Sequence, residues 1–210
     1  MRSPRFLAVV VAGLLLLSGC GEDPFAKPSG APQANAGNST VTLESLIIAA
    51  HRPMTGYSRD RFPHWRSAGS NCNVRDTVLA RDGKDIKKTG CNVTGGVWTS
   101  LYDNVTVTVA TEVDIDHMVP LANAWRSGAD KWDDNKRGDF ANDLDRPQLL
   151  AVTASSNRSK GDQDPSQWKP PSPTYWCQYA KDWIVVKSYW QLTVTKEEKS
   201  ALAQMLGTCV

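Results

Sequence analysis

The stretch EVDIDHMVPLANAW, from Glu112 to Trp125, is the most informative part of the sequence. It places three carboxylates and one of the chain's three histidines within six residues, and Pro120 follows soon after. Upstream, valines at 105, 107 and 109 alternate with threonines, the period of two that is typical of a β-strand. We therefore expect His117 to lie at the end of a strand.

The residues further along the chain supply the rest of a candidate site. PQLLAVT (147–153) predicts a short apolar strand, and ASSNRSKG (154–161) predicts one short helix that ends at its glycine. Two strands followed by a helix can bring Asp116 and His117 close to Asn157. One objection is that neighbouring side chains on a regular strand point to opposite faces. Since the proline at 120 requires the strand to end near His117, the objection is weakened but not removed.

The side-chain types of these residues suit phosphodiester hydrolysis. Asp116 and Asn157 offer oxygen ligands, which Mg²⁺ and Mn²⁺ prefer. A histidine near its ordinary pKa can take a proton from water, so a metal ion beside His117 would form a minimal phosphodiester hydrolase. The alternative is an ordinary strand face on which Glu112, Asp114 and Asp116 point into water.

The first part of the chain is typical of an export signal. A basic start precedes an apolar run that is too short for a membrane-spanning helix, and LSGC (17–20) resembles the lipobox of bacterial lipoproteins. We expect a signal peptide over 1–19 and a flexible tether over 20–41, lipidated at Cys20. The alternative is an ordinary signal peptide with an unrelated cysteine. The domain, 42–210, would then be exported and lipid-anchored to the outer face of the bacterial cell membrane, or secreted.

The charge balance excludes strong binding of nucleic acid through global charge. The whole chain has 24 Lys and Arg against 22 Asp and Glu, so loss of Arg2 and Arg5 with the signal makes the two counts equal. Binding of phosphate must therefore come from a local patch or a metal ion.

Four cysteines follow Cys20, and an even number in an exported domain predicts two disulfides. Of the three connectivities we favour the sequence-local one, because each bond then closes a modest loop. Zinc is not expected, because no CxxC occurs and no histidine lies close to a cysteine pair. The favoured pairs are Cys72–Cys91 and Cys177–Cys209.

Helical patterns flank the proposed centre. Apolar spacing and capping residues predict helices over 42–53, 74–83, 120–132, 175–192 and 195–207. Together with the strands they predict an α+β domain.

Three segments carry a resemblance to a known family: DIDHMVPLANAW (114–125), FANDLDRPQLLAVTASSNRSKGDQDP (140–165) and Trp168. They resemble the HNH, or ββα-metal, endonucleases, and within them the group named after the C-terminal domain of the GmrSD restriction enzymes. The similarity covers most of the domain, from about Trp65 to Cys209. It implies a ββα-metal core with additional flanking helices.

The resemblance, carried over by position, also implies roles for single residues. His117 would be the general base, Asp116 and Asn157 the ligands of one Mg²⁺ or Mn²⁺, and Asn142 the catalytic-site residue that supports the loop and orients the histidine. Asn157 stands where the HNH name has its last histidine, which leaves a weaker ligand. The CxxC zinc knuckles of many HNH proteins are absent, and we expect the disulfides and extra helices to replace them.

We expect a metal-dependent endonuclease that cuts DNA, with RNA as a second substrate, and that acts as a monomer with no transmembrane helix in the mature protein. The alternative is a non-catalytic cell-envelope lipoprotein that binds a partner through the same fold. A peptidase is not favoured, because neither a HExxH helix nor a GxSxG elbow is present. Candidate substrate contacts, each of which could instead be an ordinary surface or core side chain, are Lys160, Arg158 and Arg75, and, for base stacking, Trp65, Trp98, Trp125 and Trp132.

Overall fold

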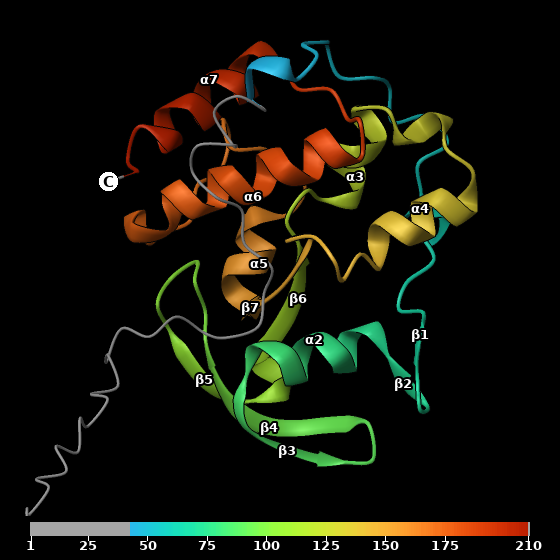
Figure 1. The fold of residues 1–210 in the computed structure, drawn as a ribbon, viewed down its shortest axis with the longest axis vertical. Helices are drawn as coiled ribbons and strands as arrows, with labels where there is room; N and C mark the ends of the chain where they lie inside the picture. Colours follow the sequence, from blue (N-terminus) through green and yellow to red (C-terminus); the bar gives the residue numbers. More distant parts are fainter. Residues whose placement is uncertain (1–42, 210) are drawn as a thin grey trace, which may run out of the picture.

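The computed structural model describes residues 43–209 (Figure 1). The expected signal peptide and Cys20 lie outside the described residues, so those predictions stay predictions. In chain order the named elements are η1 (Arg59–Arg61), β1 (Ser67–Gly69), β2 (Cys72–Asn73), α2 (Val74–Asp82), β3 (Lys84–Thr89), β4 (Asn92–Thr99), β5 (Thr106–Val109), η2 (Ala110–Glu112), β6 (Val113–His117), α3 (Leu121–Arg126), η3 (Ala129–Lys131), α4 (Asp134–Ala141), β7 (Leu149–Thr153), α5 (Ala154–Lys160), η4 (Pro173–Tyr175), α6 (Trp176–Tyr189) and α7 (Lys196–Leu206).

The centre of the fold is a strand–strand–helix unit made of β6, β7 and α5. β6 and β7 pair antiparallel, from Val113 opposite Thr153 to His117 opposite Leu149, and α5 follows β7 directly. In Figure 1 this unit lies between helices α3, α4, α6 and α7 on one side and α2 with the β3–β4–β5 sheet on the other. The predicted order of strand, strand and helix is therefore present.

β7 is buried along its whole length because it separates two hydrophobic cores. Leu149 and Ala151 pack into the core formed with α2 and β4, whereas Leu150 and Val152 pack into the larger core formed with the helices. Side chains alternate between the two faces of a strand, so an uninterrupted apolar run is what a strand with cores on both sides requires.

The smaller core is closed by a close approach between α2 and β4. Gly83 ends α2, and a Cβ at this position would lie 2.4 Å from Nε1 of Trp98, so only glycine fits. The same indole nitrogen donates to the carbonyl of Leu79 at 2.9 Å. The predicted helix at 74–83 and its glycine stop are therefore confirmed.

The structure contains two disulfides within residues 43–209, and the predicted pairing is confirmed. Cys72–Cys91 joins β2 to the β3–β4 turn. Cys177–Cys209 joins the start of α6 to the residues after α7. The α+β class, with flanking helices and two disulfides, is therefore what the structure shows. Among residues 43–209, no helix is both long and apolar enough to cross a bilayer.

The predicted helix over 42–53 is wrong. Only residues 43–45 form a helical turn, and Ile48 instead makes a parallel bridge with Val194. The backbone hydrogen bonds of this segment run to distant residues: Ala49 N–H donates to the carbonyl of Val194 at 2.9 Å, and Arg52 N–H donates to that of Arg126 at 2.8 Å. Tertiary pairing thus outweighs the local helical spacing.

Candidate functional site

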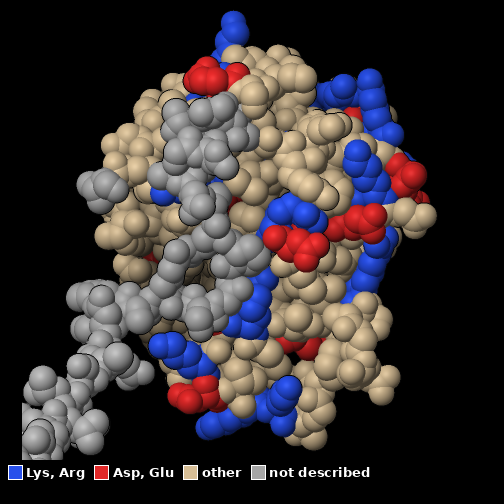
Figure 2. Space-filling view, viewed as in Figure 1, with Lys and Arg blue, Asp and Glu red and all other residues tan. Residues whose placement is uncertain are grey.

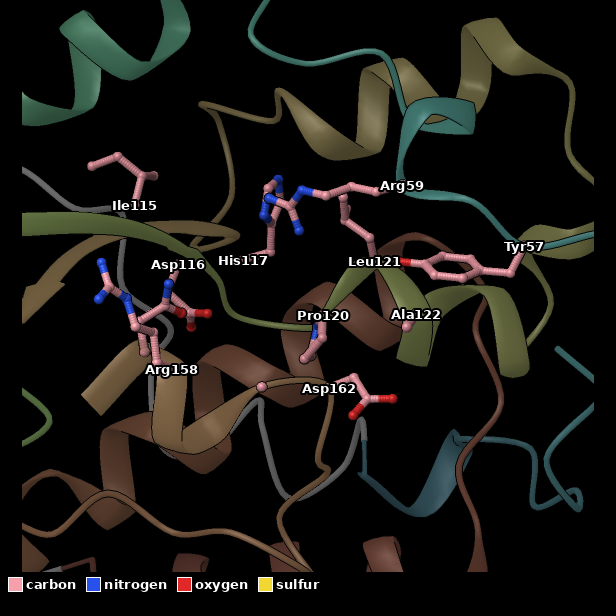
Figure 3. A pocket seen from close by; sticks show the side chains of 12 residues that line it. Tyr57, Arg59, Ile115, Asp116, His117, Pro120, Leu121, Ala122, Arg158 and Asp162 are labelled. Carbon is pink, nitrogen blue, oxygen red and sulfur yellow. The ribbon is translucent and has the colours of Figure 1, made fainter. Parts of the chain in front are cut away.

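One cavity lies where β6 ends, between α3, α5 and the η1 turn (Figure 3). Its volume is about 250 Å³, and Asp116, His117 and Asn157 all line it. The two neighbours on β6 therefore reach the same cavity, which answers the objection from strand geometry, because the strand stops at His117 and Pro120 begins the turn into α3. The three residues named by the sequence are brought together.

The hydrogen bonding of His117 identifies which ring nitrogen is available. Nε2 lies 2.9 Å from the carbonyl oxygen of Ala141. A carbonyl oxygen can only accept, so Nε2 carries the proton and Nδ1 keeps its lone pair. The ring is buried and stacks on Trp65, with centroids 5.4 Å apart and planes 9° from parallel.

Burial lowers the pKa of His117 to about 3. The hydrogen bond to Ala141 acts in the opposite direction, whereas the positive charge of Arg59 adds to the lowering. An imidazole in this environment is neutral at neutral pH, so Nδ1 is a proton acceptor under those conditions.

Asp116 is held by two buried side chains through one of its oxygens. Oδ2 accepts from the hydroxyl of Tyr102 at 2.5 Å and from the ammonium of Lys160. The same ammonium donates to the carbonyls of His117 at 2.8 Å and Met118 at 3.0 Å, so it fixes the end of β6. No hydrogen bond within residues 43–209 uses Oδ1 of Asp116, which leaves that oxygen for another ligand.

Lys160 does not fit its expected role as a substrate contact. Its side chain is fully buried and makes three hydrogen bonds inside the protein. Burial lowers its pKa, while the adjacent carboxylate of Asp116 acts in the opposite direction. Burial also raises the pKa of Tyr102, and the negative charge of Asp116 adds to that rise. Both groups therefore position Asp116 rather than meet a substrate.

The amide of Asn157 is oriented by a neighbouring carboxylate. Its Nδ2 donates to Oδ2 of Asp114 at 3.1 Å. The amide oxygen is therefore the atom of Asn157 that remains free for a cation. Together with Oδ1 of Asp116, it gives two oxygen donors from residues that line one cavity. This donor set suits a hard divalent ion with water as its remaining ligands.

Asn142 lies outside the cavity and uses its whole amide to hold the chain together. Its Oδ1 accepts from the backbone N–H of Arg66 at 2.9 Å, and its Nδ2 donates to the carbonyls of Pro63 and Gly138 at 2.7 Å each. It thereby ties the segment that carries Trp65 to α4. Trp65, whose indole stacks on His117, directly precedes Arg66, which Asn142 holds. Ala141, whose carbonyl contacts His117, directly precedes Asn142 itself.

The remaining sequence candidates fall in different places. Arg158 lines the cavity and its side chain is 75% exposed, so it can meet a substrate. Arg75 donates to the carbonyl of Val113 at 3.1 Å and lies outside the cavity, which gives it a structural contact instead. Trp98 and Trp125 are core residues, and Trp132 packs against the core.

Sequence reasoning missed Tyr102 and Arg59, among other residues at the site. Tyr102 lies in the turn after β4, and Arg59 lies in the η1 turn. Neither belongs to a periodic pattern or a motif, because each reaches the site only through tertiary folding. Figure 3 shows Arg59 and His117 entering the cavity from different segments.

Comparison with known proteins identifies the family of the chain. A family model described as "GmrSD restriction endonucleases, C-terminal domain" matches residues 75–205. An "Uncharacterized secreted protein" of Arthroderma benhamiae is 49% identical over 205 residues, which cover 97% of this chain and 98% of that protein. No solved structure matches. The chain belongs to the family of GmrSD restriction endonuclease C-terminal domains, a group of the HNH proteins.

Proposed function

We propose that the protein is an exported, metal-dependent endonuclease that hydrolyses phosphodiester bonds in DNA, with RNA as a second substrate. One observation carries the proposal: a neutral histidine with a bare Nδ1 shares one cavity with two uncommitted oxygen donors, Asp116 and Asn157. The family supports a nuclease-like role. A single chain supplies every residue of this site, so a monomer suffices.

Asp116 and Asn157 would hold one Mg²⁺ or Mn²⁺ ion. An ion of this kind, when bound, neutralises charge on a phosphate and contributes to transition-state stabilisation. The donor set contains only oxygen atoms, which favours these hard cations over zinc. The lysine bound to Asp116 reduces the negative charge that this carboxylate offers, so we expect metal affinity in the absence of substrate to be modest.

In the proposed reaction, Nδ1 of His117 takes a proton from a water molecule as the water oxygen attacks phosphorus. The bond from phosphorus to the leaving sugar oxygen breaks, and that oxygen takes a proton from solvent. A pKa of about 3 makes the free imidazole a weak base, but the negative charge of a bound phosphodiester favours the imidazolium form. Ala141, which accepts from Nε2, stabilises that form as well.

Three contacts support the histidine and the carboxylate without touching the substrate. Lys160 and Tyr102 fix Asp116, which lines the cavity, through Oδ2 and leave its second oxygen without a hydrogen bond from residues 43–209. Asn142 holds the segment whose Trp65 stacks on the imidazole. This preorganisation reduces the rearrangement that the reaction would otherwise require.

A plasmid-cleavage assay tests the proposal. Supercoiled DNA is incubated with the purified protein and Mg²⁺, Mn²⁺ or a chelator, beside the His117→Ala variant. We expect nicking and linearisation with metal, and neither product with the chelator or the variant. A wild-type protein that leaves DNA and RNA intact with every divalent ion would contradict the proposal and favour the non-catalytic alternative.

Export and anchoring form a separate part of the proposal. The signal-like start and LSGC at 17–20 support export with lipidation at Cys20, and the relative from Arthroderma benhamiae is described as secreted. We expect the wild-type protein in the membrane fraction and Cys20→Ala unprocessed or released. Recovery of unlipidated wild-type protein from the medium would favour secretion without an anchor.

A further inference from the structure

Arg59 differs from every other arginine in the described part of the chain. Within residues 43–209, it is the only arginine whose side chain has no ion pair or hydrogen bond. It is also exposed, yet it lines the cavity that contains His117, Asp116 and Asn157 (Figure 3). An exposed arginine is ordinarily just solvated, so its placement needs further support before it indicates a ligand.

The first support is that the backbone of Arg59 is firmly held. Ser58 caps the η1 turn, with its hydroxyl accepting from the N–H of Asp60 at 3.2 Å. Phe62, directly after the turn, is fully buried and packs edge-on against Phe140 with centroids 6.2 Å apart. Arg137 donates to the carbonyl of Arg61 at 2.9 Å. The guanidinium therefore extends from an anchored turn and not from a free loop.

The second support is the charge balance of the cavity and its border. Asp116 is paired with Lys160, Asp162 with Arg126, and Asp114 with Arg158. The guanidinium of Arg59 is thus a surplus positive charge next to the candidate base. Figure 2 shows positive and negative side chains interspersed over one face of the molecule, which carries no broad basic surface.

We infer that Arg59 binds the non-bridging oxygens of the phosphoryl group that is cleaved. This inference rests on the proposed function and adds to it the residue that recognises the phosphate. A planar guanidinium offers two parallel N–H donors that match two phosphate oxygens. His117 and the oxygens of Asp116 and Asn157 line the same cavity, so a phosphate held by Arg59 lies within the candidate catalytic group.

The position of Arg59 along the chain shows which part of the protein would bind the nucleic-acid backbone. The family match begins at residue 75, so the phosphate contact comes from a segment that precedes the matched part of the chain. Tyr57, on the same segment, also lines the cavity. The segment before residue 75 would therefore help to bind the nucleic-acid backbone, while the matched residues contain His117, Asp116 and Asn157.

The experiment compares Arg59→Gln and Arg59→Lys with the matched control Arg61→Gln. Arg61 occupies the same turn but pairs with Asp134 at 3.7 Å, covers the ring of Trp125 and lies outside the cavity. Two measurements are made on folded proteins of matched thermal stability: cleavage of a fluorescent single-stranded oligonucleotide with Mn²⁺, and its equilibrium binding in chelator over a range of salt concentrations.

We expect Arg59→Gln to lower kcat/KM by roughly 10²–10³-fold, the loss typical of removing one donor that stabilises transition-state charge. Arg59→Lys should lose less of kcat/KM, because lysine keeps the positive charge but lacks the two parallel N–H donors. Arg61→Gln should keep kcat/KM within about two-fold of wild type. Removal of one phosphate contact should also reduce the slope of log K against log salt by about 0.7 for single-stranded DNA.

The two proposals fail in different ways. If wild type cleaves and Arg59→Gln cleaves as well as Arg61→Gln, the inference is overturned while the proposed function stands. If wild type cleaves nothing, the proposed function fails, and the binding data alone decide about Arg59. In that case a reduced salt slope for Arg59→Gln supports the phosphate contact, and an unchanged slope overturns it.

Discussion

Two clusters within residues 43–209 place a histidine near carboxylates, and they differ in how many polar atoms are already engaged. The first is the cavity at the end of β6, with His117, Asp116 and Asn157. The second contains His51, Asp164 and Glu198, whose ligand atoms all lie within 4.8 Å of one another. By residue type alone, the second cluster is the better metal site.

The partners of Glu198 show why the second cluster is structural. Its Oε1 accepts from Nε1 of Trp183 at 2.6 Å and lies 3.1 Å from the ammonium of Lys187. Its Oε2 accepts from the N–H of Thr195 at 3.3 Å, as part of the capping box of α7. Both oxygens are engaged and a cation is already present, so a second cation would have to displace interactions that hold the helices together.

The contrast shows that a group of nearby ligand-type residues is a weaker indicator of a metal or catalytic site than polar atoms that have no hydrogen-bond partner. In the cavity at the end of β6, Nδ1 of His117, Oδ1 of Asp116 and the amide oxygen of Asn157 have no partner within residues 43–209. Their other polar atoms are engaged, which fixes their orientation. A candidate site is therefore recognised by what its supporting contacts leave free.

The largest expected effect separates the two histidines. His117→Ala should reduce the cleavage rate by roughly 10²–10⁴-fold, because the proton acceptor is removed. It should leave the Mn²⁺ concentration for half-maximal cleavage near the wild-type value. His51→Ala should change neither the rate nor this concentration. The measurement is plasmid-cleavage rate over a Mn²⁺ titration. Near-normal activity of His117→Ala, or a loss of metal affinity as large as that of Asp116→Ala, would show that His117 is not the base.

The second prediction concerns stability. Glu198→Ala should lower the free energy of unfolding by about 3–5 kcal/mol, because it leaves the buried ammonium of Lys187 without its only charged partner within residues 43–209. Urea denaturation in chelator measures this effect. The paired substitution Lys187→Met with Glu198→Leu should recover much of the loss. A Glu198→Ala variant of wild-type stability that loses a bound metal ion would reverse our assignment of the two clusters.

The third prediction concerns the proposed metal ligands. Asp116→Ala and Asn157→Ala should each raise the Mn²⁺ concentration for half-maximal cleavage by at least tenfold, since even residues behind the direct ligands cost roughly 10–100-fold. Excess Mn²⁺ should restore part of the activity. Arg75→Ala, whose residue lies outside the cavity, serves as the control. Unchanged midpoints for both ligand variants would remove the basis for the proposed ion.

The last prediction concerns the pH dependence of stability. Burial lowers the pKa of His117 to about 3 in the folded protein, against an ordinary value of about 6.5. The unfolded chain therefore binds more protons between those values, and stability falls as pH decreases through this window. Between pH 6.5 and 4.5 this one group should remove about 2 kcal/mol.

The measurement for this prediction is urea denaturation in chelator at pH 6.5 and 4.5. The matched variant is His117→Gln, which cannot titrate in this range and should lose less stability between the two values. Burial lowers the pKa of His51 as well, so a residual dependence in the same direction is expected. Equal losses in wild type and variant would mean that the pKa of His117 is the same in the folded and unfolded protein, and would contradict the prediction.

The sequence predicted the parts of the fold that depend on local pattern. The alternation before His117 and the apolar run at 147–153 indicated β6 and β7, and the export signal with an even cysteine count indicated the disulfides. The segment over 42–53 was misread, because its backbone bonds go to Val194 and Arg126. Helix α4 was not predicted, since DNKRGDFA has few apolar residues and no clear apolar face.

The residues of the candidate site also differ in whether local sequence could predict them. Asp116, His117 and Asn157 sit in motifs that can be read in order along the chain, and the structure places them on one cavity. The role of Lys160 was misjudged because lysine is rarely buried, and only the fold shows that it is enclosed beside Asp116. Arg59 reaches the site from a distant segment and leaves no local signal.

The β-bridge between Ile48 and Val194 bears on the shortest fragment that can fold and keep the candidate site complete. It joins the start of the described chain to the residues before α7, while Leu43 and Leu46 enter the larger core and Cys209 closes a disulfide beyond residue 205. A fragment trimmed to the matched residues 75–205 would expose apolar surface and lose Arg59. The transferable unit is therefore longer than the family match at both ends, and grafts or truncations should keep residues 43–209 together.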